Sequence, residues 1–189
     1  MEIVAICGSP RKRGNTATLV EALLEGARER GAKTTRFDPA AMSISDCDAD
    51  GACLESAQAG CIQHDDMQRI YEALRRADAW VLATPIYFNH VTATLKRVID
   101  RLYALFTLEG GWRVGIDRKA RGAVIVVQAD PGRETPEQVA DYLAAILGEF
   151  VFGPVLRLAE SSLGEPGDAA QRPDLLSRAR DMGRDLAGG

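Results

Sequence analysis

The chain has 189 residues, the size of one domain, of which 46% are hydrophobic and 26% charged. This globular balance excludes a disordered or collagen-like chain. With 23 basic and 27 acidic side chains, the net charge of −4 argues against a nucleic-acid or membrane-surface binder, which needs a basic field. No apolar run approaches the ~18 residues of a membrane span. Four cysteines without a visible signal peptide favour a reducing, cytoplasmic setting.

The charge is spread unevenly. Residues 1–36 carry a net +3, whereas residues 37–78 carry a net −6. A basic first unit suits an anionic ligand, and the acidic stretch is interpreted first as a solvated loop. The chain has only two histidines, which argues against a histidine-rich metal site.

Strands and helices alternate from the N-terminus onward. Glu2–Cys7 is a continuous apolar run, typical of a strand covered on both faces. Helical spacing of apolar residues predicts a helix over Asn15–Arg30, and a second strand follows at Lys33–Asp38. Residues 39–63 show no such period. At 25 residues this loop is too long for an ordinary connection, so we expect it to be functional or specially structured.

The middle of the chain continues the alternation. Asp65 or Asp66 can cap a helix that runs through Leu74. Ala79–Thr84 predicts a third strand, which Pro85 ends because proline has no N–H for a central ladder.

The next predicted helix carries apolar residues from Leu95 to Phe106, and residues 107–118 are expected to form a loop. Ala123–Gln128 predicts a fourth strand. Thr135 is then expected to cap a helix, with Gln138 closing a capping box.

Val151–Leu158 predicts the fifth strand, and Pro173 opens the last helix. Strict alternation of five strands and five helices requires a parallel sheet covered on both faces by right-handed crossovers. Residues 1–189 are therefore expected to form a single doubly wound α/β domain. Such sheets bind ligands at the carboxyl ends of the strands, so the loops after strands one, three and four are the places to look.

The loop after the first strand is a candidate phosphate cradle. It runs Gly8-Ser9-Pro10-Arg11-Lys12-Arg13-Gly14-Asn15-Thr16. Glycines permit tight turns, short polar side chains donate hydrogen bonds, and the N–H groups and dipole of the following helix favour an anion. The alternative is a plain turn with a helix cap, which Asn15 or Thr16 alone would satisfy.

Known phosphate motifs narrow this interpretation. A Walker loop needs lysine directly after its second glycine, where Asn15 stands, and the dinucleotide glycine motif is absent. Cys7 and Arg13 have the C-x5-R spacing that resembles low-molecular-weight tyrosine phosphatases, in which Asp130 could serve as the acid. Against this, Gly14 stands where that pattern wants serine or threonine, and a buried strand residue is the simpler interpretation of Cys7.

The loop after the third strand runs Thr84-Pro85-Ile86-Tyr87-Phe88-Asn89-His90. Aromatic side chains beside a phosphate cradle suit a flat heteroaromatic ring. The alternative is that Tyr87 and Phe88 pack in the core or a dimer contact.

Together these motifs resemble the NADPH-dependent FMN reductase family of flavodoxin-like proteins, which is related to iron–sulfur flavoproteins. The matching segments, from residue 1 to about 105, are Ile6-Cys7-Gly8-Ser9-Pro10-Arg11, Gly14-Asn15-Thr16, Pro85-Ile86-Tyr87-Phe88, Leu95-Lys96 and Ile99-Asp100-Arg101. The resemblance implies a 2-1-3-4-5 sheet, non-covalently bound FMN, and a homodimer or homotetramer that often completes the flavin site.

The resemblance also implies site residues. The phosphate would be held by Ser9, Arg11, Asn15 and Thr16, in a loop that includes Arg13 and Gly14. The isoalloxazine would be bordered by Pro85, Ile86, Tyr87, Phe88 and Asn89, and the ring or ribityl chain approached by Gln128 and Asp130. The Asp100-Arg101 pair is expected to be structural or interfacial. His90 would lie near the ring, with a solvent-facing loop histidine as the alternative.

The long loop departs from the family pattern. Cys47, Cys53 and Cys61 resemble the compact four-cysteine run of the iron–sulfur flavoproteins, but Asp50 stands where the second cysteine would fall. A [4Fe–4S] cluster normally takes four thiolates. We therefore expect no cluster and no zinc, with these three cysteines as the candidate ligands if a cluster is bound. His64 is expected to be exposed or capping.

The expected function is flavin chemistry. A hydride would pass from NAD(P)H to the FMN, and two electrons would then leave to a small-molecule acceptor such as a quinone, a nitro or azo compound, or free flavin. No catalytic side chain is required, so the scarcity of histidines is no objection. A flavodoxin-type electron carrier is the second hypothesis, and the phosphatase the third.

Overall fold

The computed structural model describes residues 1–54, 60–109, 111–116, 121–132 and 134–188. Within these residues, five parallel strands form one sheet in the order β2-β1-β3-β6-β7. The strands are β1 (Glu2–Cys7), β2 (Lys33–Phe37), β3 (Ala79–Pro85), β6 (Arg121–Val127) and β7 (Leu156–Glu160). The predicted order 2-1-3-4-5 is confirmed, because β4 and β5 lie outside this sheet.

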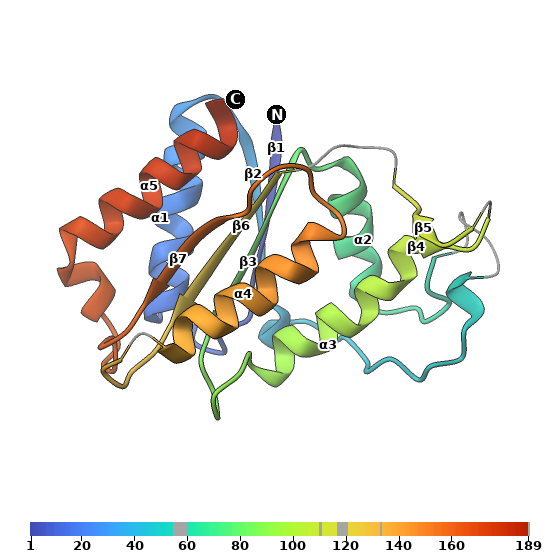
Figure 1. The fold of residues 1–189 in the computed structure, drawn as a ribbon, viewed down its shortest axis with the longest axis horizontal. Coiled ribbons are helices and arrows are strands. Elements are labelled where there is room, and N and C mark those ends of the chain that lie inside the picture. Colours follow the sequence, from blue (N-terminus) through green and yellow to red (C-terminus); the bar gives the residue numbers. More distant parts are fainter. Residues whose placement is uncertain (55–59, 110, 117–120, 133, 189) are drawn as a thin grey trace.

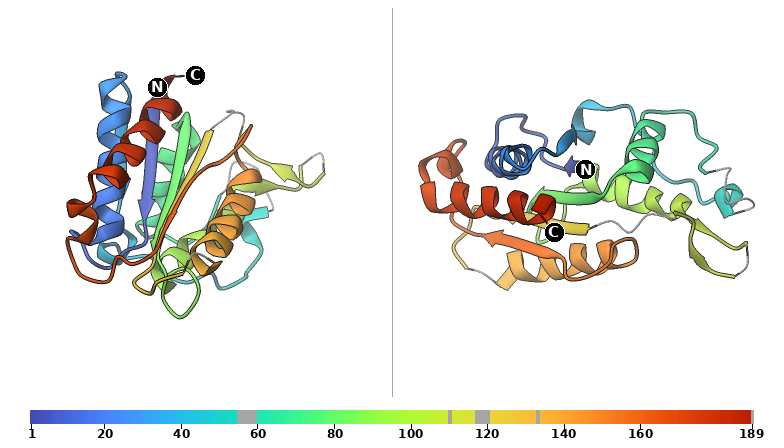
Figure 2. Two further views of the ribbon diagram at one scale, coloured as in Figure 1. Left: turned by 60° about the vertical axis from the view of Figure 1, so that its left-hand side comes forward. Right: turned by 90° about the horizontal axis from the view of Figure 1, so that it is seen from above.

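Helices cover both faces of the sheet (Figures 1 and 2). One face carries α1 (Asn15–Glu29) and α5 (Pro173–Gly188), and the other carries α2 (Met67–Arg76), α3 (Ala93–Arg101) and α4 (Glu134–Gly148). Along β1 the side chains alternate, with Ile3 and Ala5 buried under α1 and α5, and Val4 and Ile6 buried on the opposite face. Burial on both faces explains why the strands read as continuous apolar runs.

The loops after β1, β3, β6 and β7 gather at one edge of the sheet, opposite the two chain ends (Figure 1). This follows from parallel pairing, which places the carboxyl ends of all strands together. No helix in the described part of the chain is long and apolar enough to cross a membrane.

The helix predicted to reach Phe106 ends earlier. α3 stops at Arg101, and a 3-10 turn, η3 (Leu102–Leu105), leads into an antiparallel hairpin. Its strands are β4 (Phe106–Thr107) and β5 (Arg113–Val114), so the loop expected over 107–118 contains a hairpin, with residues 110 and 117–120 outside the described residues. The ring of Phe106 stacks on that of Trp112 with centroids 5.0 Å apart, a contact that a continued helix could not make.

Two boundaries near the C-terminus also differ. The fifth strand was predicted at Val151–Leu158 but β7 occupies Leu156–Glu160. Val151 is buried in the core instead, and Gly153, with φ of +82°, turns the chain before the strand begins. Val151 forms an isolated β-bridge outside β7, and its apolar side chain packs in the core.

The predicted capping box of α4 is wrong. The helix includes Glu134, one residue before the expected cap Thr135. The Nε2 of Gln138 donates to Oε1 of Glu134 at 3.3 Å, a contact along the helix surface, instead of closing a capping box.

The long loop contains two short 3-10 turns, η1 (Pro39–Ala41) and η2 (Ala52–Leu54). The rest of its described part is irregular, and residues 55–59 lie outside the described residues. The loop expected over 39–63 is therefore confirmed within that part.

α1 and α5 pack backbone to backbone through two glycines. A Cβ added to Gly183 would lie 1.9 Å from the carbonyl oxygen of Leu23, and one added to Gly26 would lie 2.0 Å from that of Arg180. Since no Cβ tolerates such distances, any side chain here must force the helices apart.

We expect Gly183→Ala to lower the free energy of unfolding by about 3 kcal/mol, because overpacking displaces two helix backbones. The matched control is Gly148→Ala at the end of α4, where a Cβ meets nothing within 4 Å, and which should change stability by less than about 1 kcal/mol. Urea unfolding followed by circular dichroism measures both. Equal midpoints for the two variants would contradict the close contact.

Candidate functional site

A cavity of about 140 Å³ opens at the carboxyl edge of the sheet. It lies where the loops after β1, β3, β6 and β7 meet, which is where a doubly wound sheet binds ligands. Its walls are formed by Ser9, Arg11, Gly14, Asn15, Thr16, Pro85, Ile86, Tyr87, Val127, Ala129, Leu163 and Gly164.

The first wall is the uncapped start of α1. Its N-cap residue is Gly14, no side-chain cap is present among the described residues, and the first turn holds no acidic residue. The N–H groups of this turn therefore lack the usual side-chain acceptor, and the helix dipole favours an anion in front of them. Ser9, itself buried, accepts the N–H of Arg11 at 3.2 Å and shapes the turn that faces the helix. This is a suitable place for a phosphate group.

Gly8 is required by a neighbouring helix. Its carbonyl oxygen accepts hydrogen bonds from Thr92 Oγ1 at 2.7 Å and Thr94 Oγ1 at 3.0 Å. A Cβ on Gly8 would lie 2.6 Å from the Cβ of Leu95. The phosphate-type loop is thus locked against the N-terminus of α3, a role for Gly8 that the sequence did not indicate.

The side chain of Asn15 holds the opposite wall of the cavity. Its Nδ2 donates to the carbonyl oxygens of Leu163 at 3.0 Å and Glu165 at 2.9 Å. Its Oδ1 accepts the N–H groups of Gly167 at 3.2 Å and Ala169 at 3.1 Å. The amide has no capacity left, so Asn15 would contact a phosphate through its backbone N–H, which lies in the first turn of α1.

The loop after β3 contains a strained two-residue turn. Tyr87 and His90 exchange backbone hydrogen bonds at 2.9 and 3.2 Å, and between them Phe88 and Asn89 have φ of 47° and 63°. Non-glycine residues in this left-handed region are uncommon and often mark functional sites. The turn leaves Phe88 fully exposed, while the His90 ring meets that of Tyr142 at 4.6 Å.

Several predicted site residues lie outside the cavity wall. They are Arg13, Phe88, Asn89, Gln128 and Asp130. The Nε2 of Gln128 donates to the carbonyl oxygens of Asp130 at 3.1 Å and Gly132 at 3.4 Å, so it shapes its own loop while Ala129 faces the cavity.

Leu163 and Gly164 form a wall that the sequence did not predict. They follow β7, and all parallel strands deliver their loops to one edge, so the fifth loop belongs there as well. Because the fifth strand was predicted to end at Leu158 and not at Glu160, the residues that follow it were not recognised as part of the site.

Cys7 does not have the environment of a nucleophile. It is fully buried, and burial raises the pKa of its thiol despite the opposing hydrogen bond from the Ser9 backbone. A nucleophilic cysteine needs the opposite shift. The geometry therefore gives no support to the phosphatase alternative.

A second cavity, of about 510 Å³, lies between the long loop and the end of α3. We call it the cysteine cavity. Its walls include Cys47, Asp50, Cys53, Cys61, Tyr71, Asp100, Arg101 and Tyr103. All four cysteines of the chain are free thiols.

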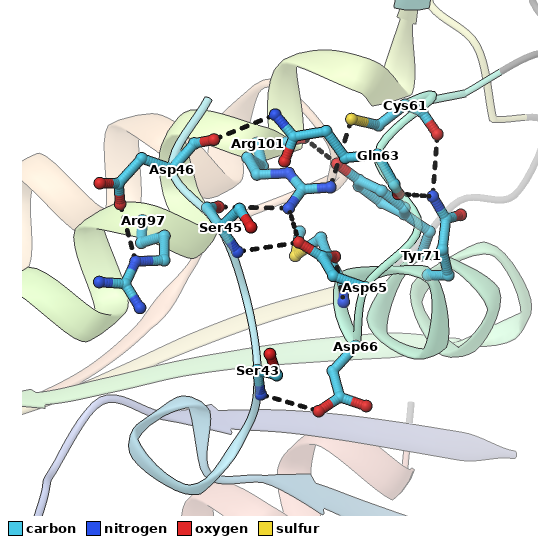
Figure 3. A network of polar contacts seen from close by, with 12 residues as sticks. Ser43, Ser45, Asp46, Cys61, Gln63, Asp65, Asp66, Tyr71, Arg97 and Arg101 are labelled. Atoms are coloured by element: carbon cyan, nitrogen blue, oxygen red, sulfur yellow. Dashed lines mark hydrogen bonds and ion pairs between the residues drawn. The ribbon is translucent and has the colours of Figure 1, made fainter. Parts of the chain in front are cut away.

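Arg101 is the centre of a polar network beside the cysteine cavity (Figure 3). Its side chain is 1% exposed and forms an ion pair with Asp65. One guanidinium nitrogen also donates to the carbonyl oxygen of Ser45 at 3.2 Å, and the other donates to Sγ of Cys61 at 3.3 Å. The hydroxyl of Tyr71 donates to the carbonyl oxygen of Arg101 at 2.7 Å, and burial raises the pKa of that hydroxyl.

Asp65 connects this network to α2. Its carboxylate accepts the N–H groups of Ser45 at 2.8 Å and Met67 at 2.9 Å, which confirms the predicted capping role. Partial burial raises the pKa of Asp65, but the hydrogen bonds from Arg101 and these two N–H groups outweigh it, so the pKa lies below its usual value. Arg101 is thus structural, as expected, while Asp100 pairs with Lys96.

The donor groups of the cysteine cavity do not match a four-thiolate cluster. Three thiols and the Asp50 carboxylate line it, whereas a [4Fe–4S] cluster takes four cysteines. Within the described residues, no three cysteine, histidine or acidic side chains are placed to hold a metal ion.

Comparison with known sequences gives one family. The model described as NADPH-dependent FMN reductase matches residues 1–164. An iron–sulfur flavoprotein of Archaeoglobus fulgidus is 33% identical over 189 residues, covering 99% of this chain and 79% of the relative. An iron–sulfur flavoprotein of Methanocaldococcus jannaschii is 31% identical over 194 residues, covering 99% and 96%.

Solved structures give the same fold. An NAD(P)H:quinone oxidoreductase from Methanothermobacter marburgensis has a TM-score of 0.77 at 22% identity, covering 98% of each chain. An FMN-dependent NADH-azoreductase from Bacillus anthracis, in complex with FMN, has a TM-score of 0.68 at 13% identity and covers both chains completely. An archaeal flavodoxin has a TM-score of 0.61 at 13% identity, covering 99% of this chain and 96% of its own. The predicted flavodoxin-like fold is confirmed.

We expect Asn15→Ala to release the loop after β7, because four hydrogen bonds, two of them buried and two partly buried, are lost together. Stability should fall by about 3 kcal/mol, and hydrogen exchange of the Gly167 and Ala169 amides should accelerate. The control is Thr18→Ala on the same helix, whose hydroxyl only donates to the Gly14 carbonyl at 3.2 Å. Exchange mass spectrometry of residues 163–170 provides the measurement, and unchanged exchange in Asn15→Ala would refute the tether.

Proposed function

The chain belongs to the NADPH-dependent FMN reductase family, and we propose that it binds FMN and transfers two electrons from NAD(P)H to a small-molecule acceptor. The observation that carries the proposal is the uncapped start of α1 in the same cavity as Ile86 and Tyr87. One element offers N–H donors to a phosphate, and the other offers apolar and aromatic surface to a ring.

The phosphate end of FMN would lie against the first turn of α1. Backbone N–H groups of Asn15 and Thr16 are the proposed donors, and the guanidinium of Arg11 adds positive charge at the rim. Ser9 lies beside them and donates its hydroxyl to the carbonyl oxygen of Arg11 at 3.3 Å. An anion in this place supplies the acceptor that the N-cap Gly14 lacks.

The ring would lie at the outer rim, beside Ile86 and Tyr87. The cavity of about 140 Å³ is smaller than the ~300 Å³ of sites that enclose a whole ligand, so it suits the phosphate and the adjoining chain. Bound FMN supplies hydride chemistry, and the protein's contribution is to bind and orient it.

The acceptor that we propose is a quinone or an azo compound. A nitro compound and free flavin are the other small-molecule acceptors that we consider. Structural neighbours named as a quinone oxidoreductase and an azoreductase support this range. We place the protein in the cytoplasm, where four free thiols stay reduced.

The test is reconstitution with FMN, followed by absorbance spectra and turnover of NADH and NADPH with a benzoquinone. We expect flavin bands and direct reduction by a nicotinamide cofactor. A protein that takes up no FMN, or takes it up and is not reduced, would refute the proposal; the second result would indicate an electron carrier.

A separate variant tests the proposed position of the phosphate. Ser9→Asp places a carboxylate in front of α1, and we expect about tenfold weaker binding of FMN because the two anions repel. Binding of riboflavin, which has no phosphate, should be unchanged and serves as the matched control.

We also propose that a second copy of the chain covers the ring edge, giving a homodimer or a tetramer built from such dimers. Phe88 is fully exposed, and Tyr87 and Trp112 are 48% and 52% exposed. Large exposed aromatics are typical of interfaces. Sedimentation equilibrium at micromolar concentration should give at least twice the chain mass. Phe88→Ser should weaken association, and the association constant of Trp112→Ser is measured for comparison. A monomer would refute this contact.

A further inference from the structure

We propose that Thr92 is a positioning residue, which holds the phosphate loop (residues 8–16) in place relative to the wall that would face the ring. Its effect on FMN rests on the proposed function, whereas its contacts with the loop do not. Thr92 is the N-cap of α3 and is 2% exposed, and its Oγ1 accepts the N–H of Leu95 at 3.3 Å. The same hydroxyl donates to the carbonyl oxygen of Gly8 at 2.7 Å. One side chain therefore begins a helix and binds the loop that follows β1.

Gly8 is the point at which the phosphate loop leaves the sheet, and both of its backbone groups are bound. Its N–H donates to the carbonyl oxygen of Ala83 in β3 at 2.8 Å. Its carbonyl oxygen accepts from Thr92 and, at 3.0 Å, from Oγ1 of Thr94. A Cβ on Gly8 would lie only 2.9 Å from Thr92 Oγ1, so the two residues are in close contact. The direction in which the loop starts is therefore set from α3.

The two threonine hydroxyls also determine where the negative end of a peptide dipole lies. A carbonyl oxygen carries partial negative charge and would repel a phosphate that it faced. The carbonyl of Gly8 is instead bound on the side of α3, and the next residue, Ser9, lines the cavity while Gly8 does not. Thr92 and Thr94 thus keep this oxygen from opposing an anion at the start of α1.

Thr92 contacts the opposite wall of the cavity through its backbone. Its N–H donates to Oγ1 of Thr84 at 3.2 Å, and this hydroxyl donates in turn to the carbonyl oxygen of Pro85 at 2.8 Å. Pro85 and Ile86 form the wall at which the ring would lie. A change of the Thr92 side chain removes its contact with the phosphate loop but leaves its backbone contact with this second wall. A positioning role consequently predicts a defect that depends on the phosphate group of the ligand.

The variant Thr92→Val tests this dependence, because it replaces the hydroxyl with a methyl group of similar size. Dissociation constants of FMN and riboflavin are measured by flavin fluorescence. We expect FMN to bind about tenfold more weakly, and riboflavin, which has no phosphate, to bind within about twofold of the wild type. Thr92→Ser keeps the hydroxyl and should restore FMN binding to within about twofold of the wild type. Equal weakening of both ligands would make Thr92 only a helix cap, and unchanged binding of FMN would likewise overturn the proposal.

Thr94→Val is the matched control on the same carbonyl. It removes the longer of the two hydroxyl contacts and keeps the N-cap of α3, so FMN should bind less than about threefold more weakly. A larger effect in Thr94→Val than in Thr92→Val would overturn the assignment to Thr92.

A titration of the wild-type protein with inorganic phosphate needs neither flavin nor a variant, so it decides the case if Thr92→Val does not fold. In NMR spectra the amide signals of Asn15 and Thr16 report the anion. We expect the methyl signals of Thr92 and Thr94 to shift with the same midpoint. The methyl signal of Thr107, a buried residue of β4 outside the cavity wall, should not move.

The outcomes separate this inference from the proposed function. If the amide signals at the start of α1 shift while the two threonine methyl signals stay in place, the role of Thr92 is overturned and the function is untouched. If all four signals respond to phosphate but the protein takes up no FMN, the function is refuted and the role of Thr92 in the loop stands. A wild-type protein that binds neither phosphate nor FMN would overturn both.

Discussion

The fold depends on covering a parallel sheet on both faces. Each strand buries alternate side chains under different helices, as Ile3 and Val4 do on adjacent positions of β1. Helices on both faces require crossover connections, and these bring every loop that follows a strand to the same edge. The uncapped N-terminus of α1, the turn at Tyr87 and the loop at Leu163 meet there for this reason, although they are far apart in the sequence.

Features that depend on residues close together in the sequence could be predicted, whereas contacts between distant residues could not. The strand at Glu2–Cys7 could be predicted because burial on both faces leaves a local apolar pattern. The loop from Ser9 to Thr16 could be singled out because its glycines and short polar residues form a local motif, and the structure shows that it lines the cavity at the carboxyl edge. The tether that the Asn15 side chain forms could not be predicted, because its partners lie 148 to 154 positions away and asparagine suits a phosphate contact equally well. The predicted fifth strand begins too early, at Val151, because burial in the core and burial in a sheet favour the same side chains; the structure gives Val151 an isolated β-bridge outside β7.

The two cavities differ in how their positive charge is balanced. At α1, partial positive charge from backbone N–H groups faces a cavity without a protein acceptor, which leaves the place to a ligand. At α3, the full charge of Arg101 is neutralised by Asp65, and the two terminal nitrogens also donate to the carbonyl oxygen of Ser45 and to the Cys61 thiol. A buried ion pair contributes little to net stability, whereas breaking it leaves a costly unpaired charge, so the network fixes the position of the long loop.

α3 links these two places. At its N-terminal end Thr92 and Thr94 bind the carbonyl of Gly8, and at its C-terminal end Arg101 holds Ser45 and Cys61. A nine-residue helix is about 13 Å long and does not bend easily over that distance. The loop that faces the first cavity and the loop that forms the second are therefore attached to one rigid element.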